Sequence, residues 1–268
     1  MRNRFLFFIG LTILLLLVTA ALMAPFIAPY NPTEQNLEKD LLPPSQEHFI
    51  GTDKLGRDIL SRTIYGARIS LSVGVSTVSI SLLIGILIGS LSGFFGGWID
   101  QFLMRMVDVL MAFPGILFAI ALTAVLGPGL NHVVLALCLI GWTSYARLVR
   151  GEILSLREKE FILAARALGG HPSRIILIHM LPNLLAPLLI QATLGMATAI
   201  IGEGGLSFLG LGAQPPTPSW GSMLNEGRQF LLVAPHLTTF PGLAIMFTVL
   251  GLNLIGDGLR GMLEKKGP

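Results

Sequence analysis

Long apolar runs alternate with short polar segments along the whole chain. Each run is long enough to cross the roughly 30 Å hydrocarbon core of a bilayer as a helix that rises about 1.5 Å per residue. The pattern therefore predicts an all-α, multi-pass membrane protein with about six transmembrane helices. The six runs are residues 5–28, 71–94, 107–126, 130–149, 184–201 and 237–255.

The first run can be interpreted in two ways. It follows Arg2 and Arg4 and contains small residues at 18–20 (VTA), a pattern that is typical of a cleaved signal peptide. The apolar run continues through Ala24, however, which gives it the length of a membrane span. We expect an uncleaved first transmembrane helix.

Composition supports the membrane interpretation. Hydrophobic residues make up 53% of the chain and charged residues only 12%, against about 25% in soluble domains. The net charge of +3 is spread between the apolar runs, so no basic patch for nucleic acid is indicated. The single cysteine, Cys138, lies within an apolar run, which excludes an intramolecular disulfide and a thiol metal cluster.

The distribution of basic residues predicts the orientation. With the N-terminus in the cytosol, twelve of the 18 Lys and Arg residues fall on the cytosolic side. We therefore expect a multi-pass protein of the cell (inner) membrane with both termini in the cytosol. Five of the other six crowd into the first external segment. We expect residues 56–67 to form an interfacial helix from which Arg57, Arg62 and Arg68 extend to the lipid headgroups.

The chain is thereby divided into three parts. Residues 1–28 are the first transmembrane helix, residues 29–69 an external loop with the interfacial helix, and residues 70–268 a five-helix core. A long cytosolic loop, residues 151–183, belongs to the core and is the longest segment predicted on that side. No part is large enough to be a soluble catalytic domain.

The cytosolic loop has the pattern of two helices that meet at a corner. The stretch 161–168 is apolar after an acidic start and ends at Gly169, while Pro172 suits the first turn of a second helix that Pro182 helps to end. Small residues such as Ala165 leave room for a docking partner. An amphipathic hairpin lying on the lipid headgroups fits the same residues equally well.

The spacing of this loop resembles the EAA loop of binding-protein-dependent ABC importers. That pattern is Glu-Ala-Ala, three residues, Gly, nine residues, Ile, one residue, Leu-Pro. Leu163 replaces the Glu and His179 replaces the Ile, while the spacing is kept throughout. The residues that the resemblance assigns to coupling with an ATPase are Leu163, Ala164, Ala165, Gly169, Pro172, Leu181 and Pro182.

Three further stretches resemble the dipeptide/oligopeptide/nickel branch of these importers, and in particular its second (C-type) permease subunit. They are residues 51–62 (GTDKLGRDILSR), 206–212 (LSFLGLG) and 218–221 (PSWG). The resemblance implies a type I importer fold and a permease for di- or oligopeptides. It also implies four kinds of partner: a homologous second permease subunit, one or two ATPase subunits, an external solute-binding protein and the lipid bilayer.

The chain itself is not expected to be an enzyme. It contains no Gly-x-x-x-x-Gly-Lys-Ser/Thr loop to bind nucleotide phosphates, so ATP hydrolysis is expected in the separate ATPase subunits. We expect no cofactor. Two alternatives stay open: the same class of transporter carrying nickel or another small solute, and an ion-coupled secondary transporter. A scaffolding role is a third, weaker alternative.

Small residues recur every four positions along the second apolar run. The stripe lets another helix approach closely, either as static packing or as a surface that slides during transport. Its members are Thr77, Ser81, Gly85, Gly89 and Gly93.

Few other side chains suggest chemistry. Glu203 and Asp108 are ionisable groups near membrane depth, so each is either a pathway or gate residue or a solvated interfacial group. Trp98 and Trp220 are expected to anchor the two membrane interfaces. The five histidines show no short metal-ligand spacing, so no metal site is predicted.

Overall fold

The computed structural model describes residues 2–263, and the regular elements of that part are helices. Thr52 and Asp58 form one isolated β-bridge. The helices are α1 (Arg2–Leu22), α2 (Ala24–Ile27), η1 (Leu37–Lys39), α3 (Ile59–Phe95), α4 (Gly97–Met111), α5 (Gly115–Leu126), α6 (Leu130–Arg157), α7 (Glu160–Ala167), α8 (Pro172–Arg174), η2 (Ile175–Met180), α9 (Leu181–Phe208), α10 (Trp220–Gly227), η3 (Arg228–Phe230) and α11 (His236–Leu263).

Five helical segments among the described residues are long and apolar enough to cross a membrane: α1, α3, α6, α8 to α9, and α11. The pair α4 and α5 makes a sixth span if its two halves are counted together, and they are bent by 84°. The prediction of about six spans is thus confirmed, but the prediction of one uninterrupted helix over residues 107–126 is wrong. The chain breaks before Pro114, which has no N–H to continue a helix.

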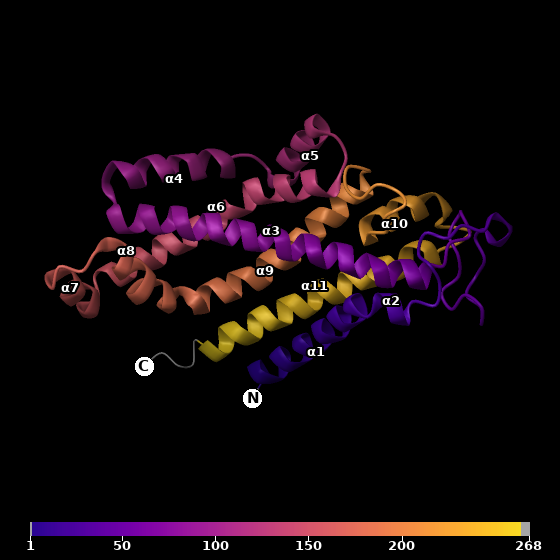
Figure 1. Cartoon of the computed structure of the whole chain (residues 1–268), viewed down its shortest axis with the longest axis horizontal. Coiled ribbons are helices and arrows are strands. Elements are labelled where there is room, and N and C mark those ends of the chain that lie inside the picture. Colours follow the sequence, from indigo (N-terminus) through magenta and orange to yellow (C-terminus); the bar gives the residue numbers. More distant parts are fainter. Residues whose placement is uncertain (1, 264–268) are drawn as a thin grey trace.

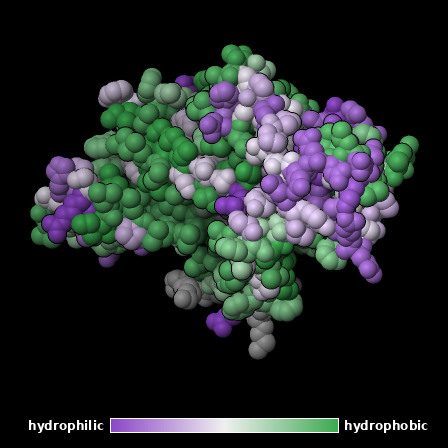
Figure 2. Space-filling view, turned by 45° about the vertical axis from the view of Figure 1, so that its right-hand side comes forward, coloured by the Kyte–Doolittle hydropathy of each residue, from purple (hydrophilic) through white to green (hydrophobic). Residues whose placement is uncertain are grey.

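The long helices run side by side along one axis (Figure 1). The start of α1 and the end of α11 lie together. They are so close that a Cβ at Gly261 would clash with the side chain of Asn3. These ends point toward the α7 end of the bundle, whereas α10 and residues 28–58 form the opposite end. Figure 2 shows hydrophobic residues over the middle, with hydrophilic residues gathered at the two ends. This is the surface expected of a bundle that is embedded in lipid.

The glycine stripe of α3 lies against α6. A Cβ at Gly89 would lie 2.5 Å from the carbonyl oxygen of Ala146, and a Cβ at Gly93 would lie 2.9 Å from Ile153 Cγ2. Gly85 is packed in the same way against Tyr145. The absence of side chains at these positions lets the two backbones approach closely.

The predicted interfacial helix is absent as a separate element. α3 begins at Ile59, capped by the Asp58 carboxylate, and runs without a break to Phe95 across the predicted boundary at residues 69 and 70. Arg57 and Arg62 are buried, so the expectation that they extend to headgroups is wrong. The physical reason is that two carboxylates lie close enough to pair with them, as described below.

Trp220 is not an interfacial anchor either. Its side chain is buried, and the indole N–H donates a hydrogen bond to the carbonyl oxygen of Thr63 at 2.9 Å. The ring packs over Gly66, where a Cβ would lie 2.9 Å from it. Trp220 therefore joins α10 to α3, whereas Trp98 is exposed as an anchor requires.

Candidate functional site

The helix, glycine corner and second helix expected in residues 151–183 are all present. α7 carries Glu160 in its first turn and Arg166 in its last, which matches the helix dipole. Gly169 then has a φ of +76°, which favours glycine, and its N–H donates to the carbonyl oxygen of Arg166 at 2.9 Å. Pro172 occupies the start of α8.

Pro182 does not end the second helix, which corrects the sequence interpretation. α8 continues through the π-helical turn η2 into α9, and the segment Pro172–Phe208 is a single candidate span. A π-turn adds one residue to a helical turn and so shifts the pattern of backbone hydrogen bonds. We attribute to this shift that the helix continues through Pro182, which lies in the first turn after η2. The loop is therefore joined rigidly to a membrane helix.

α7 has two different faces. Its inner face carries Ile162, which is fully buried, and Ala165, which packs against the same cluster. Its outer face is exposed and mostly apolar, and Leu168 just beyond it is 89% exposed. The buried cluster consists of Tyr145, Val149, Ile153, Ile162, Ile175, Met180, Leu184 and Leu188. The exposed apolar residues are Phe161, Leu163, Ala164, Ala167 and Leu168, which we call the α7 face.

A second contact ties α7 to the end of α3. The guanidinium carbon of Arg166 lies 4.6 Å from the centre of the Phe94 ring, within the range of a cation–π interaction. Through the buried cluster and this contact, α7 is connected to α3, α6 and α9.

A cavity of about 530 Å³ lies among α3, α5, α6 and α9. Its volume falls in the range of small-molecule sites, about 300–1,000 Å³. Among the described residues, those that line it carry no charged or histidine side chain. The polar lining residues are Thr77, Ser81, Ser144, Tyr145, Gln191 and Thr198.

The buried cluster extends from α7 to this cavity. Tyr145 belongs to both: it packs in the cluster with Ile162 and it lines the cavity. Its hydroxyl donates a long hydrogen bond, 3.5 Å, to the carbonyl oxygen of Gln191 on α9. The same hydroxyl lies against Gly195, where any side chain would clash with it. A displacement of α7 therefore has a packed route to the cavity wall.

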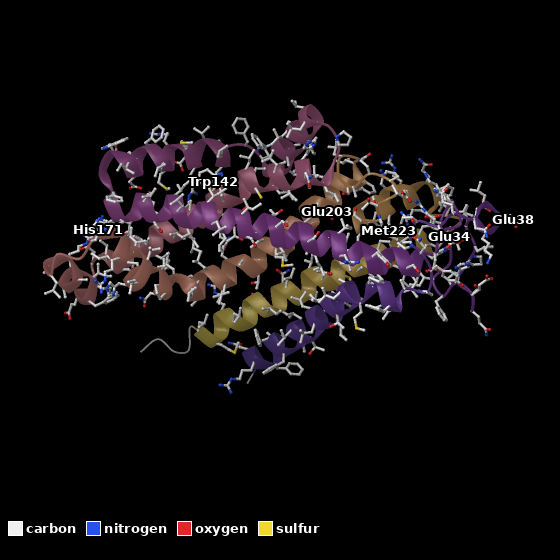
Figure 3. All side chains as sticks on the ribbon, viewed as in Figure 1. Glu34, Glu38, Trp142, His171, Glu203 and Met223 are labelled. Carbon is white, nitrogen blue, oxygen red and sulfur yellow. The ribbon has the colours of Figure 1, made fainter. Side chains whose placement is uncertain are left out.

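The two ionisable candidates lie outside the cavity lining. Glu203 lies on α9 in the middle of the bundle (Figure 3) and is fully buried. Its carboxylate accepts hydrogen bonds from Ser70 of α3 at 3.0 Å and from Ser207 at 2.7 Å. Asp108 is exposed on α4 and pairs with Arg147 at 2.8 Å. A gate role for either residue stays a prediction.

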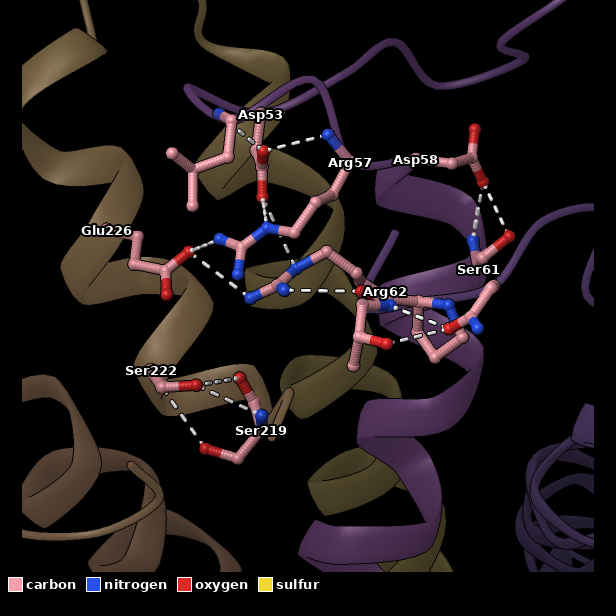
Figure 4. A network of polar contacts seen from close by, with 12 residues as sticks. Asp53, Arg57, Asp58, Ser61, Arg62, Ser219, Ser222 and Glu226 are labelled. Carbon is pink, nitrogen blue, oxygen red and sulfur yellow. Dashed lines mark hydrogen bonds and ion pairs between the residues drawn. The ribbon is translucent and has the colours of Figure 1, made fainter. Parts of the chain in front are cut away.

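At the opposite end of the bundle lies a buried ionic cluster (Figure 4). Arg57 contacts Asp53 and Glu226, each at 2.6 Å, and Arg62 contacts Glu226 at 3.2 Å and Asp53 at 3.5 Å. The cluster joins the segment before α3, the start of α3 and α10. Sequence reasoning missed it, although the i,i+4 spacing of Asp53 and Arg57 was a local signal for one of the pairs.

Family models and similar proteins agree with this architecture. Residues 85–266 match the binding-protein-dependent transport system inner membrane component, and residues 1–44 match the N-terminal TM domain of oligopeptide transport permease C. A dipeptide transport system permease protein, DppC, from Alkalihalophilus pseudofirmus is 47% identical over 96% of this chain and 85% of its own length.

A second relative is the glutathione transport system permease protein GsiD of Escherichia coli, 49% identical over 94% of this chain and 84% of that protein. Among solved structures, an inward-facing MetNI methionine ABC transporter matches with a TM-score of 0.60 and 20% identity, over 76% of this chain and 97% of that chain. The structural match supports the fold alone. The chain belongs to the family of binding-protein-dependent transport system inner membrane components, and is a permease subunit of an ABC importer.

Proposed function

We propose that this permease carries di- or oligopeptides. The relatives described above are named for a dipeptide and for glutathione, which is itself a peptide. In this proposal, a homologous second permease subunit completes the path, and an external solute-binding protein delivers the substrate. One or two ATPase subunits hydrolyse the ATP.

The structural observation behind the coupling to an ATPase subunit is the pairing of an exposed α7 face with a buried core on the other side of the same helix. Leu163 and Leu168 leave apolar surface uncovered, and fully burying an exposed leucine side chain is worth at most about 1.5–3 kcal/mol. Ile162 and Ala165 meanwhile fix α7 to the helices that line the cavity. An ATPase subunit that covers this face can thus move the cavity walls.

The proposed coupling residues have separate tasks. The exposed residues contact the ATPase subunit, the corner sets the angle of α7, and the residues at the start of α9 pass the motion into the membrane. They are Leu163, Ala164, Ala165, Gly169, Pro172, Leu181 and Pro182.

This proposal places α7, the start of α1 and the end of α11 in the cytosol, and residues 28–58 with α10 outside. The excess of basic residues at the α7 end supports this orientation. Lys265 and Lys266, which contribute to that excess, lie outside the described residues.

Uptake by the assembled transporter tests the proposal. Gly169→Pro imposes a φ near −65° where the corner needs +76°, and Ala164→Arg places a bulky charge on the exposed α7 face. Both are expected to abolish uptake of a labelled dipeptide while the protein stays in the membrane in normal amount. Ser155→Arg, at an exposed position of α6 near the same end, is the matched control and should transport normally.

Two results would contradict the proposal. Normal uptake by both α7 variants would exclude coupling through this face. Uptake of a nickel chelate but of no dipeptide by the wild-type complex would keep the transporter class and exclude peptides as its cargo.

A further inference from the structure

We infer that Asp108 and Arg147 stand at the cytosolic end of the peptide path, where their ion pair opens and each side chain contacts one charged terminus of the cargo. This inference rests on the proposed function and names residues that recognise the substrate. Three features support it: the depth of an exposed ion pair in the membrane, its place beside the cavity, and its open hydrogen-bonding capacity.

The pair lies at the depth of the hydrocarbon core. α6 has 28 residues, whereas a helix that crosses the roughly 30 Å core needs about 20 of them. Whichever end of α6 extends beyond the core, Arg147 falls within it, and Asp108 is 2.8 Å away. Both side chains are nevertheless half exposed, Arg147 at 50% and Asp108 at 57%. Charged groups at this depth face a water-filled path or another protein, because hydrocarbon is unfavourable for them.

The pair also lies directly beyond the cavity. On α6, Arg147 follows Ser144 by one turn and Ile140 by two, so it shares a helix face with two residues that line the cavity. Asp108 lies on α4, which leads into α5 and its lining residue Gly115. α4 covers the half of the bundle nearer α7 (Figure 1), which the proposed orientation places toward the cytosol. A molecule that leaves the cavity along this face passes the pair.

A neighbouring ion pair is bonded more completely. Arg150 donates two hydrogen bonds to Asp100, at 2.5 and 2.6 Å, and Ser92 donates a third to the same carboxylate. Asp108 and Arg147 share a single hydrogen bond, from Nη2 to Oδ1, and neither side chain makes another within residues 2–263. Because both side chains are exposed, their remaining donors and acceptors are open to a molecule in the path.

The two charges match the ends of a peptide. At neutral pH a free peptide carries an ammonium group at its N-terminus and a carboxylate at its C-terminus. The Arg147 guanidinium can donate two hydrogen bonds to a carboxylate, and the Asp108 carboxylate accepts hydrogen bonds from an ammonium group. A peptide thus replaces one ion pair by two, which offsets the cost of opening the first. The cavity lining, without charge among its described residues, cannot make these contacts itself.

Cysteine labelling tests whether the pair lies in water. Asp108→Cys and the control Leu16→Cys are each built into the complete transporter, in lipid nanodiscs that leave both membrane faces open to a charged methanethiosulfonate reagent. Leu16 is 68% exposed on the apolar helix α1. The natural Cys138 is buried, so the wild-type chain gives the background. We expect Asp108→Cys to react about a hundredfold faster than Leu16→Cys, because a charged reagent does not enter hydrocarbon.

Protection by peptide tests whether cargo reaches the pair. The labelling of Asp108→Cys is repeated with Ala-Ala, which has both charged termini, and with N-acetyl-Ala-Ala-amide, which has neither. Arg147 is intact in this variant and can still bind a carboxylate. Ala-Ala should therefore slow the labelling, whereas the blocked peptide at the same concentration should leave the rate unchanged.

Uptake into liposomes by the complete transporter, with its binding protein saturated by Ala-Ala, supplies a second readout. Arg147→Gln should lower the maximal rate about tenfold, the effect of losing a hydrogen bond to a charged group. Its unfolding temperature should stay that of the wild type, because an exposed ion pair adds little stability. Arg105→Gln, at another exposed arginine of this region on α4, is the control and should transport normally.

Three results would overturn the inference. If Asp108→Cys reacts no faster than Leu16→Cys, lipid or the second permease subunit covers the pair. If it reacts fast but Ala-Ala and the blocked peptide act alike, the pair lies in water without contacting the termini. If the wild-type transporter takes up no dipeptide, the proposed function fails and the contact with peptide termini fails with it, a result that uptake alone distinguishes from the other two.

Discussion

The two ends of this bundle are completed in opposite ways. At the α10 end, Arg57 and Arg62 are buried and each contacts two carboxylates of the same chain. At the α7 end, the helix is held by the apolar contacts of Ile162, while its other face leaves Leu163 and Leu168 exposed. The charges at the α10 end are paired within the chain, whereas apolar side chains at the α7 end are left exposed for a partner to cover.

This difference separates two kinds of stability. A buried ion pair is directional, and losing one partner leaves the other charge buried and uncompensated. Apolar packing is non-directional, but close packing still joins α7 to α6 and α9. We therefore expect residues 28–58, the start of α3 and α10 to move together, and α7 to move together with the helices on which it packs when a partner binds.

The largest expected effect comes from breaking the ionic cluster. Arg57→Ala leaves the buried Asp53 and the half-buried Glu226 with less positive charge, which should lower the free energy of unfolding by about 3–5 kcal/mol. Thermal unfolding of the purified chain in detergent measures this. Lys39→Ala, which removes an exposed ion pair with Glu47, is the control and should leave the unfolding temperature unchanged. Equal effects of the two would refute the contrast between buried and exposed pairs.

An intermediate effect is expected at the inner face of α7. Ile162→Ala creates a cavity in the buried cluster and should lower the free energy of unfolding by about 2–4 kcal/mol. Leu163→Ala removes a similar side chain from the exposed face, so it should leave the stability of the isolated chain unchanged. Yet it should weaken binding of the ATPase subunits, which co-purification measures. A loss of stability in both variants would show that α7 has no free face.

The smallest effect is expected from the contact between α7 and α3. Arg166→Gln removes the cation from the Phe94 ring and should lower the free energy of unfolding by about 0.5–1 kcal/mol, the value typical of an exposed cation–π pair. Arg174→Gln, an exposed arginine on α8, serves as the matched control. Chemical unfolding of the two variants side by side resolves a difference of this size. An identical midpoint would show that the Arg166–Phe94 contact does not stabilise the fold.

The spans and the α7 corner could be predicted because local patterns determine them. Apolar run length gave the membrane helices, and Gly169 with Pro172 gave the corner. The break between α4 and α5 was missed because the apolar composition continues across it, although Pro114 was a local signal. The continuation past Pro182 depends on a π-turn, which no simple residue pattern predicts.

Other features depend on contacts between distant segments. Glu226 contacts Arg57 and Arg62 from more than 160 positions away, so no local pattern predicts this second carboxylate. The cavity is likewise formed by four helices. Thr77 and Ser81 were recognisable in the sequence only as small residues for helix packing.

The most direct test of the central claim, that the α7 face binds an ATPase subunit, is site-specific photo-crosslinking in intact cells. A photoreactive amino acid is placed at Leu163 in one strain and at Leu232, fully exposed near the opposite end, in another. We expect the probe at position 163 to crosslink to a nucleotide-binding protein and the probe at position 232 not to. Crosslinking of Leu163 to lipid alone would contradict it, and would show that α7 lies on the membrane surface.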